Sequence, residues 1–316
     1  MSNQAPQFSD IKKAHERIKP FVHRTPVFSS QSINRILKMD LKFKCENFQK
    51  VGAFKFRGAT NAVRQIDKKQ AKKGVTTHSS GNHAAALSLA AKQLGVPAYI
   101  VMPTSAPEIK KKAVEGYGAK ITYCEPTLQA REETLSKVQE ETGAVFIHPY
   151  NNFNVICGQG TSAKELLEDY PDLDVLIAPV GGGGLMSGSV ISAKAINPEI
   201  QVFGAEPLNA DDAFRSYNQG VLIPAGPPNT IADGLLTSLS TLTFQIIRDH
   251  LDGMLTAKEE SIIGAMRMIW ERMKIVVEPS AAVPLAVVME NRYLFKDKKI
   301  GLIVSGGNVD LNSLPF

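Results

Sequence analysis

A lysine stands between two phenylalanines in the stretch Gly52-Ala-Phe-Lys55-Phe-Arg-Gly58. Aromatic neighbours remove water from an ammonium group, which disfavours its charged form and lowers its pKa. A neutral amine is a nucleophile and can form a Schiff base with an aldehyde. Taken alone, the pattern favours a surface lysine whose phenylalanine neighbours enter the core, because lysines are seldom buried, and only the turns described next favour the nucleophile.

Four consecutive glycines follow the apolar run 175–180 and precede a helical segment that includes Leu185. Without Cβ atoms, backbone N–H groups in such a turn can converge on an anion, and a helix N-terminus adds a positive dipole. The turn lacks the residues that dinucleotide-binding and P-loop motifs require. It predicts a phosphate site, with a purely structural turn as the alternative. The glycines are Gly181, Gly182, Gly183 and Gly184.

Two more polar turns follow apolar runs. Ser79-Ser-Gly-Asn-His83 comes after the run 75–78, and Ser305-Gly-Gly-Asn308 ends the run 300–305. The carboxyl ends of strands in an open parallel sheet are where ligands gather, so the three turns predict one binding site. The alternative is that these side chains cap helices, which is the stronger interpretation for Asn308 and the weaker one for the first turn.

Short runs rich in Val, Ile, Tyr and Phe alternate with longer segments of helical period, which is typical of parallel strands joined by crossover helices. The chain is therefore expected to be α/β. The expected strands are 41–45, 75–78, 98–102, 120–124, 145–148, 175–180, 202–205 and 300–305. The expected helices include 84–94, 108–117, 131–142 and 162–170.

Near the C-terminus, Thr256 and Glu259 have the spacing of a capping box, which predicts a helix start. The helix that follows places apolar side chains on one face, expected to be core or subunit contact. These are Ile262, Ile263, Met266, Ile269, Trp270 and Met273.

The composition narrows the class of protein. With 316 residues, 43% hydrophobic and 21% charged, the chain is expected to be globular with about two domains. The net charge is +5, but basic residues are scattered among acidic ones, which favours a small anionic ligand over nucleic acid. No apolar run reaches the length of a membrane span, so no membrane partner and a cytoplasmic location are expected. Cys45, Cys124 and Cys157 are expected to be small buried side chains.

Together, four motifs resemble the serine racemase and serine/threonine dehydratase family, pyridoxal-phosphate enzymes of fold type II. They are Gly52-Ala-Phe-Lys55-Phe-Arg-Gly-Ala59, Ser79-Ser-Gly-Asn-His83, the tetraglycine and Ser305-Gly-Gly-Asn308. The resemblance covers essentially the whole chain. It implies two open, twisted, parallel-type sheets flanked by helices. Residues 1–71 and 152–316 would form a large cofactor-binding domain, and residues 72–151 a small mobile domain inserted into it.

The resemblance also implies roles for the cofactor site. Lys55 is the Schiff-base lysine, with Phe54 beside the cofactor, and Gly181 to Gly184 with Leu185 hold the phosphate. Asn82 bonds the ring hydroxyl, and Ser305 meets the pyridine nitrogen. Because a serine hydroxyl does not keep that nitrogen protonated, elimination and rapid reprotonation at Cα suit the site better than transamination.

Racemisation needs an acid and a base on opposite faces of Cα, and Lys55 can serve only one. By resemblance Ser80 serves the other, with helix capping as the alternative. The turn residues Ser79, Ser80, Gly81, Asn82 and His83 are expected to bind the substrate, their N–H groups holding its carboxylate. His83 is read as a positioned turn residue. Arg131 matches an arginine near the substrate, with an exposed helical arginine as the alternative.

A second site is expected after the run 202–205. Glu206, the Ala210 carbonyl and Asp212 match the divalent-cation site of the racemases, and hard oxygen ligands suit Mg²⁺, Ca²⁺ or Mn²⁺. From the residues alone, an acidic surface turn is the alternative. The cation would be structural or activating.

The expected function is interconversion of L- and D-serine, accompanied by β-elimination of serine to pyruvate and ammonia. One alternative is a dehydratase acting on L-threonine, L-serine or 3-hydroxyaspartate with little racemisation. Another is an amino-acid-binding regulator without catalysis. The resemblance implies a homodimer. The alanines after His83 replace a Gly-Gln pair of animal racemases, and Tyr150 also differs from them, so ATP activation and the preferred substrate stay open.

Overall fold

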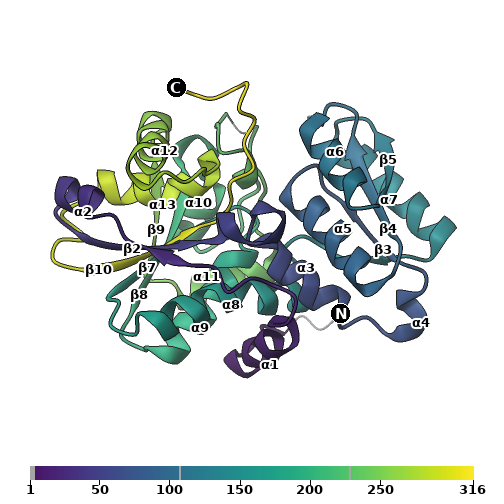
Figure 1. Ribbon diagram of the computed structural model, residues 1–316, viewed down its shortest axis with the longest axis horizontal. Coiled ribbons are helices and arrows are strands. Elements are labelled where there is room, and N and C mark those ends of the chain that lie inside the picture. The colour runs from purple at the N-terminus through teal and green to yellow at the C-terminus, as the bar shows by residue number, and fades with distance from the viewer. Residues whose placement is uncertain (1–3, 107, 228) are drawn as a thin grey trace.

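The computed structural model describes residues 4–106, 108–227 and 229–316, which fold around two sheets (Figure 1). The six-stranded sheet has the order β1-β2-β10-β7-β8-β9, and the four-stranded sheet has the order β5-β4-β3-β6. All pairs are parallel except β1 with β2. The strands are β1 Val27–Phe28, β2 Asp40–Cys45, β3 Val75–His78, β4 Ala98–Pro103, β5 Lys120–Cys124, β6 Val145–Phe146, β7 Val175–Pro179, β8 Gln201–Pro207, β9 Gly253–Ala257 and β10 Lys299–Val304. The prediction of an α/β fold with two parallel-type sheets is confirmed.

Helices cover both faces of the six-stranded sheet, with α12 and α13 on one side and α8 and α9 on the other, while α5, α6 and α7 surround the four-stranded sheet (Figure 1). The α-helices are α1 Phe8–Ile18, α2 Gln31–Leu37, α3 Lys55–Val63, α4 Lys68–Ala71, α5 Asn82–Leu94, α6 Glu108–Gly116, α7 Leu128–Thr142, α8 Phe153–Asp169, α9 Gly184–Ile196, α10 Asp212–Gln219, α11 Thr241–His250, α12 Glu259–Met273 and α13 Pro279–Glu290. The short 3-10 helices are η1 Glu46–Phe48, η2 Lys50–Gly52, η3 Leu208–Ala210 and η4 Asp233–Leu235.

The strands of the four-stranded sheet all fall between residues 75 and 146. This stretch lies inside the 72–151 segment expected to form an inserted domain, and that domain division stays a prediction. All eight expected strands are present, and β1 and β9 were not expected. Helix α8 begins at Phe153, well before the expected start at 162. None of the described helices is long and apolar enough to cross a membrane.

The expected capping box at Thr256 is wrong. Strand β9 runs through to Ala257, so Thr256 pairs with Glu206 of β8, and Lys258 is the N-cap of α12 without a side-chain hydrogen bond. The apolar face of α12 is correct, since Ile262, Met266 and Ile269 are buried, and Trp270 and Met273 pack against the same core. All three cysteines are free and buried, as expected.

Helices α3, α8 and α9 approach one another through glycines. A Cβ atom added to Gly158 of α8 would lie 2.6 Å from Gly58 Cα of α3, and one added to Gly188 of α9 would lie 2.5 Å from the backbone nitrogen of Gly160. These distances are too short for any side chain, so the backbones are in direct contact. Helix α3 is therefore held tightly against the large sheet's helical layer.

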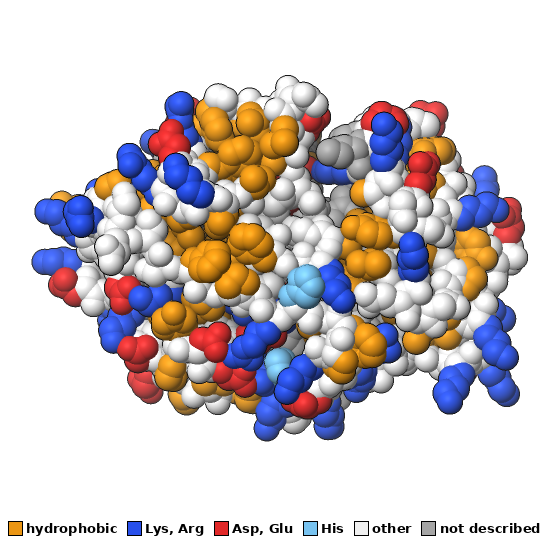
Figure 2. Space-filling model, in the orientation of Figure 1, with side chains coloured by type: hydrophobic (Ala, Val, Ile, Leu, Met, Phe, Trp, Pro, Cys, Tyr) orange, Lys and Arg blue, Asp and Glu red, His pale blue; other side chains and the backbone are white. Residues whose placement is uncertain are grey.

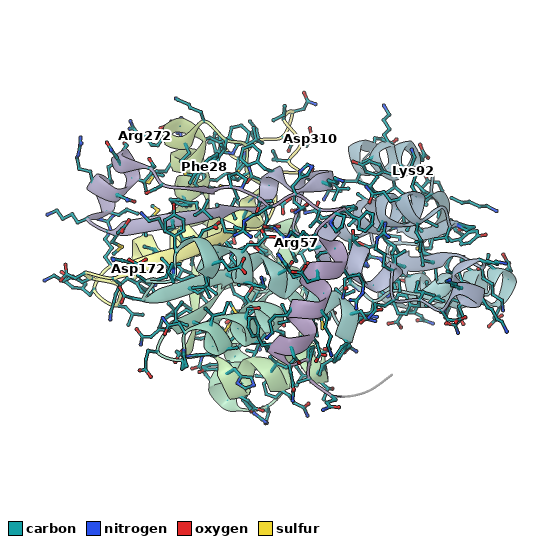
Figure 3. The ribbon with its side chains drawn as sticks, turned by 60° about the horizontal axis from the view of Figure 1, so that its bottom comes forward. Phe28, Arg57, Lys92, Asp172, Arg272 and Asp310 are labelled. Atoms are coloured by element: carbon teal, nitrogen blue, oxygen red, sulfur yellow. The ribbon has the colours of Figure 1, made fainter. Side chains whose placement is uncertain are left out.

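A buried group of four charged side chains, here called the Arg57 cluster, fastens α3 to the six-stranded sheet. Arg57 lies near the centre of the molecule in Figure 3. Its guanidinium donates to Glu46 at 2.7 Å and to Glu165 at 2.7 Å, and Lys44 Nζ donates to Glu165 at 2.7 Å. Two cations and two carboxylates thus compensate one another inside the protein.

Candidate active site

Lys55 is the first residue of α3 and is half-buried. Its Nζ donates to the carbonyl oxygen of Pro149 at 3.2 Å and lies 5.1 Å from the Phe54 ring centroid. Burial lowers the pKa of Lys55 to about 8, although the nearby Glu278 carboxyl acts in the opposite direction. Roughly a tenth of this amine is therefore uncharged at pH 7, far more than for an ordinary lysine, and the uncharged form is the nucleophile.

The chain around Lys55 is joined directly to the C-terminal turn. The backbone N–H of Phe54 donates to the carbonyl oxygen of Ser305 at 3.0 Å, and Ala53 forms a bridge with Gly306. Asn308 Nδ2 donates to the carbonyl oxygen of Val51 at 2.8 Å. Ser305 therefore lies beside the lysine. Asn308 does not cap a helix, which corrects the alternative favoured from sequence: only turns follow it.

The tetraglycine turn packs against Tyr150, the residue that follows Pro149. Gly183, with φ of +81°, is the N-cap of α9, so the turn leads into a helix N-terminus as expected. A Cβ atom on Gly182 would lie 2.2 Å from the Tyr150 ring, and one on Gly184 2.9 Å from Tyr150 Cβ. All four glycines and Leu185 are buried. The glycines thus contact Tyr150, which follows Pro149, the hydrogen-bond acceptor of Lys55. The first N–H groups of α9 have no acceptor within the helix and can bind an anion.

The Ser79–His83 turn follows β3 and starts α5. Gly81 is the N-cap of α5 and no side chain caps it, so the interpretation of Ser80 as a capping residue is wrong. His83 is buried, and its Nε2–H is within 3.1 Å of the Ile147 carbonyl oxygen. Burial and then the charge of Lys55 lower the pKa of His83 to about 3. His83 is neutral and fixed in place, which agrees with its reading as a turn residue.

Asn82 connects this turn to the opposite sheet. Asn308 Nδ2 donates to Asn82 Oδ1 at 2.9 Å. Asn82 Nδ2 donates to both carboxyl oxygens of Glu278, each at 3.1 Å. Lys55, Asn82 and Ser305 are thereby brought to one place, where the strand ends of the two sheets meet.

Glu278 is a site residue that the sequence analysis missed. Its side chain is 3% exposed, and burial raises the pKa of its carboxyl to about 7 despite the Asn82 hydrogen bond. The only signal in the sequence is a glutamate before Pro279 at the start of α13, which reads as an ordinary helix N-terminus.

Arg131 lies in the first turn of α7. It is half-buried, and its Nε finds no hydrogen-bond partner among the described residues. Burial lowers the pKa of His78, the residue before the Ser79 turn, and the charge of Arg131 contributes to this lowering against Glu132. Arg131 therefore lies close enough to the turn to be felt electrostatically.

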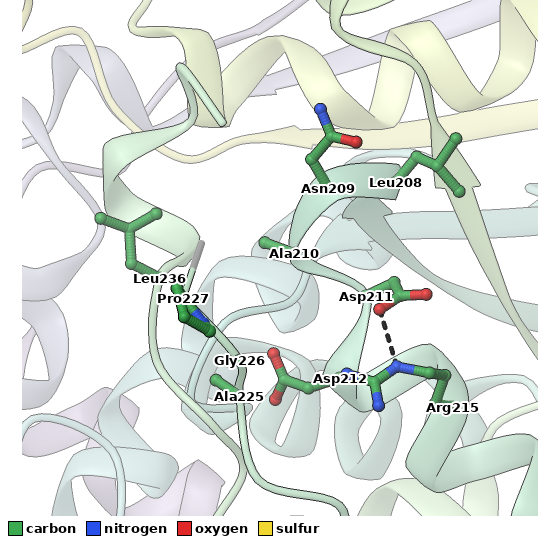
Figure 4. Close-up of a pocket in the computed structure, with 10 residues that line it drawn as sticks. All are labelled: Leu208, Asn209, Ala210, Asp211, Asp212, Arg215, Ala225, Gly226, Pro227 and Leu236. Carbon is green, nitrogen blue, oxygen red and sulfur yellow. Dashed lines mark hydrogen bonds and ion pairs between the residues drawn. The ribbon is translucent and has the colours of Figure 1, made fainter. Parts of the chain in front are cut away.

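The expected cation ligands come from the end of β8, η3 and the start of α10, and Figure 4 shows two of them, Ala210 and Asp212. They line or adjoin a cavity of about 200 Å³ that includes Ala210 and Asp212. Glu206 accepts hydrogen bonds from the N–H groups of Ala213 at 3.2 Å and Phe214 at 2.6 Å. Burial and Asp212 raise the pKa of Glu206 well above its usual range, and burial raises that of Asp212. Because Asp212 Oδ2 is buried without a partner in the described structure, a cation fits the electrostatic need of this pair.

Residues 18–306 match the family model described as pyridoxal-phosphate dependent enzyme, and the chain belongs to this family of enzymes. Among its relatives, a β-hydroxyaspartate dehydratase of Paracoccus denitrificans is 51% identical over 311 residues, covering 98% of this chain and 99% of the relative. A serine racemase of Arabidopsis thaliana is 53% identical over 309 residues, covering 96% and 93%. The structure of maize serine racemase superposes with a TM-score of 0.96 at 48% identity, covering 98% and 95%. The resemblance expected from the four motifs is confirmed.

Proposed function

We propose that this chain interconverts L- and D-serine and also converts serine to pyruvate and ammonia. The observation that carries the proposal is the Lys55 amine, with its pKa lowered to about 8, at the meeting point of the three strand-end turns. The serine racemases among its relatives support the choice of substrate. Pyridoxal phosphate, bound through Lys55, supplies the electron sink that makes the Cα proton of an amino acid acidic.

The chain's own residues would then act as follows. The N–H groups at the start of α5 hold the substrate carboxylate, and those of the tetraglycine turn hold the cofactor phosphate. Lys55 Nζ removes the Cα proton from one face. When Ser80 Oγ returns a proton from the other face, the product is D-serine. When the β-hydroxyl leaves as water instead, subsequent hydrolysis gives pyruvate and ammonia.

The Ser80→Ala variant tests this division of labour. We expect it to lose L-serine racemisation by about 100-fold, the usual worth of a positioned acid or base, while pyruvate formation falls by much less. Both products are measured in one sample by chiral amino-acid analysis and a coupled pyruvate assay. Ser88→Ala is the matched control, because Ser88 lies on α5, the helix that follows the Ser80 turn, and its hydroxyl donates to the Ala84 carbonyl oxygen of the same helix. Equal losses of both activities in Ser80→Ala would refute the second-face role.

A dehydratase acting on 3-hydroxyaspartate is the second candidate function. Two observations favour it: the identity with the Paracoccus β-hydroxyaspartate dehydratase, and Arg131, whose Nε has no partner within the described ranges and whose charge acts on His78 next to the Ser79 turn. A second carboxylate on the substrate would satisfy that donor. A substrate panel decides, since this function requires Arg131→Met to reduce kcat/KM for 3-hydroxyaspartate far more than for serine. Absence of turnover on any amino acid, despite a borohydride-stable adduct at Lys55, would leave the regulator alternative.

We also propose that Glu206, Asp212 and the Ala210 carbonyl bind Mg²⁺, Ca²⁺ or Mn²⁺. Asp212 Oδ2, which has no hydrogen-bond partner among the described residues, and the raised pKa of Glu206 support a cation, which would bind mainly through these oxygens and water. Titration calorimetry with each ion is expected to show binding that Asp212→Asn removes. Asp211→Asn is the control, because Asp211 pairs with Arg215 at 2.8 Å. A chelator that changes neither activity nor melting temperature would contradict the site.

We propose further that the chain is a cytoplasmic homodimer. Exposed apolar side chains at Phe28, Phe48 and Val276 support a subunit contact, and the rings of Phe28 and Phe48 lie 5.9 Å apart. Free buried cysteines agree with a reducing compartment. On the face seen in Figure 2, acidic and basic side chains are interspersed, which agrees with a small-molecule substrate rather than nucleic acid. Sedimentation analysis at micromolar concentration tests the dimer.

A further inference from the structure

The amide of Asn82 has a fixed orientation. Its Oδ1 accepts from Asn308 Nδ2 at 2.9 Å, and its Nδ2 donates to the two oxygens of Glu278 at 3.1 Å each. A rotation of the amide by 180° would set one NH₂ group against another and a carbonyl oxygen against a carboxyl group. Because an amide's oxygen only accepts and its nitrogen only donates, Asn308 and an ionised Glu278 exclude that alternative.

Both neighbours of Asn82 are anchored to the six-stranded sheet. Glu278 N–H donates to the Gly306 carbonyl oxygen at 3.1 Å, and the Glu278 carboxyl accepts from Asn308 N–H at 3.2 Å. A Cβ atom on Gly306 would lie 2.7 Å from Glu278 Oε1, so the carboxyl is closely confined. Asn82 itself begins α5, which packs on the four-stranded sheet. The hydrogen bonds of Asn82 to Glu278 and Asn308 therefore join the two sheets at the candidate site.

Glu278 does not act as part of a salt bridge. No lysine or arginine nitrogen lies within 4.0 Å of its carboxyl among the described residues, and its nearest electrostatic neighbours are Asp233, Lys110 and Lys55. Burying a carboxyl without a paired cation costs stability. Its hydrogen bonds go to Asn82 and Asn308, so its effect is concentrated on the orientation of one amide.

We propose that Glu278 and Asn308 are positioning residues that lock the Asn82 amide so that its N–H faces the ligand, and that the site thereby selects the ionised ring oxygen of its cofactor. The equal distances of 3.1 Å from Nδ2 to the two oxygens of one carboxyl fit a single hydrogen shared between them, so the second hydrogen of the amide nitrogen stays available. A donor stabilises an oxygen anion more than a hydroxyl. This inference rests on the proposed function, in which Asn82 faces the ring oxygen of pyridoxal phosphate.

The test measures two quantities in the purified full chain: the dissociation constant for pyridoxal phosphate, by fluorescence titration of the apoenzyme, and the melting temperature of the apoenzyme. At about pH 8, where Glu278 is ionised, Glu278→Gln replaces one acceptor oxygen by a donor, and we expect the dissociation constant to rise about tenfold, the effect of one hydrogen bond. Asn308→Ala is expected to act on the same amide, so the two effects combine less than additively. Glu290→Gln, at the exposed far end of α13, is the matched control and leaves the constant unchanged.

A swap of polarity separates positioning from mere stability. Asn82→Asp sets two carboxyl groups against each other and is expected to lower the melting temperature. Adding Glu278→Gln to Asn82→Asp restores a donor opposite an acceptor, so the melting temperature recovers. The affinity for the cofactor does not recover, because the donor that faces the ring oxygen is still missing.

Two results would overturn the inference: unchanged affinity in Glu278→Gln, or recovery of affinity together with melting temperature in the swapped variant. If the parent enzyme itself forms no borohydride-stable adduct at Lys55, the proposed function fails and the inference fails with it. A parent that forms the adduct beside variants that bind equally well refutes the inference alone.

Discussion

Two carboxyl groups are buried to almost the same extent in this protein, Glu165 at 2% exposure and Glu278 at 3%. Burial raises the pKa of both, but Arg57 and Lys44 reverse the effect at Glu165 and bring its pKa to about 2. Glu278 receives only N–H groups of amides, and its pKa rises to about 7. Depth alone therefore does not decide the charge of a buried acid; directly paired cations do.

The buried charged groups of this protein fall into two kinds, those that other side chains compensate and those that they do not. The Arg57 cluster is compensated internally, so it needs nothing from solution and serves to fasten α3. Glu278 and the Glu206–Asp212 pair are not compensated by the protein. Strongly perturbed groups without internal partners are where ligands and ions bind. The predictions below test this separation, beginning with the largest expected effect.

Removing the cation at the centre of the compensated cluster should have the largest effect on stability. Arg57→Met leaves Glu46 and Glu165 buried without their guanidinium, which is expected to cost about 3–5 kcal/mol of unfolding free energy. Urea denaturation of the apoenzyme measures it. Arg64→Met is the control: its guanidinium lies 3.2 Å from the Phe21 ring centroid, and about 1 kcal/mol is expected. Similar losses in both variants would contradict the special position of Arg57.

Replacing Glu278, which has no paired cation in the described part of the chain, should raise the unfolding free energy, whereas replacing Arg57 lowers it. Between pH 4.5 and 7 the unfolded chain releases the Glu278 proton while the folded chain keeps it, so rising pH destabilises the parent relative to Glu278→Gln. Above pH 7 the full difference is on the order of 3 kcal/mol in favour of the variant. Apoenzyme denaturation over this pH range measures it. The variant would thus bind the cofactor less well while being no less stable, and a pH-independent difference would contradict this account.

The lowered pKa of Lys55 can be titrated directly. Reaction of the apoenzyme with an amine-specific reagent, followed by peptide mass analysis, is expected to be half-maximal near pH 8 at Lys55. A free lysine in a model peptide, with a pKa of about 10.4, is the control. Glu278→Gln should shift the midpoint further down, because the carboxyl raises the pKa of the amine. An unmoved midpoint would show that the two groups are not coupled.

The smallest effect is expected at the rim of the site. Lys110 of α6 pairs with Asp233 of η4 at 2.6 Å, but the side chains are 26% and 48% exposed. Lys110→Ala should cost at most about 1 kcal/mol, and the difference should disappear in 1 M salt, where the screening length is about 3 Å. A loss comparable with that of Arg57→Met would undermine the separation between buried and exposed pairs.

The sequence predicts those strands and helices whose local residue pattern agrees with their burial in the fold. Strand β7 is buried at every position, so it appears as one apolar run between turns. The missed strands lie at the edges of the six-stranded sheet, where β1 has two residues and β9 is only partly buried. Thr256 and Glu259 have the spacing of a capping box, but pairing with β8 keeps Thr256 in a strand. Tertiary pairing there outweighs local preference.

The site was predictable where its residues form continuous motifs. Lys55, the Ser79 turn, the tetraglycine and Ser305 each belong to one short segment with recognisable chemistry. Glu278 does not, because its importance comes from burial against Asn82 and Asn308, residues remote in the chain. Nothing local distinguishes such a glutamate from one that only begins a helix.

The glycine contacts between α3 and α8 make the position of Lys55 sensitive to changes at a distance from it. Gly58 is three positions after Lys55 on the same helix, and Gly158 touches it without space for a methyl group. An alanine at 158 would push the whole helix, and the amine at its beginning would move with it. The position of Lys55 Nζ thus depends on the Gly58–Gly158 contact, which is not expected to touch a substrate.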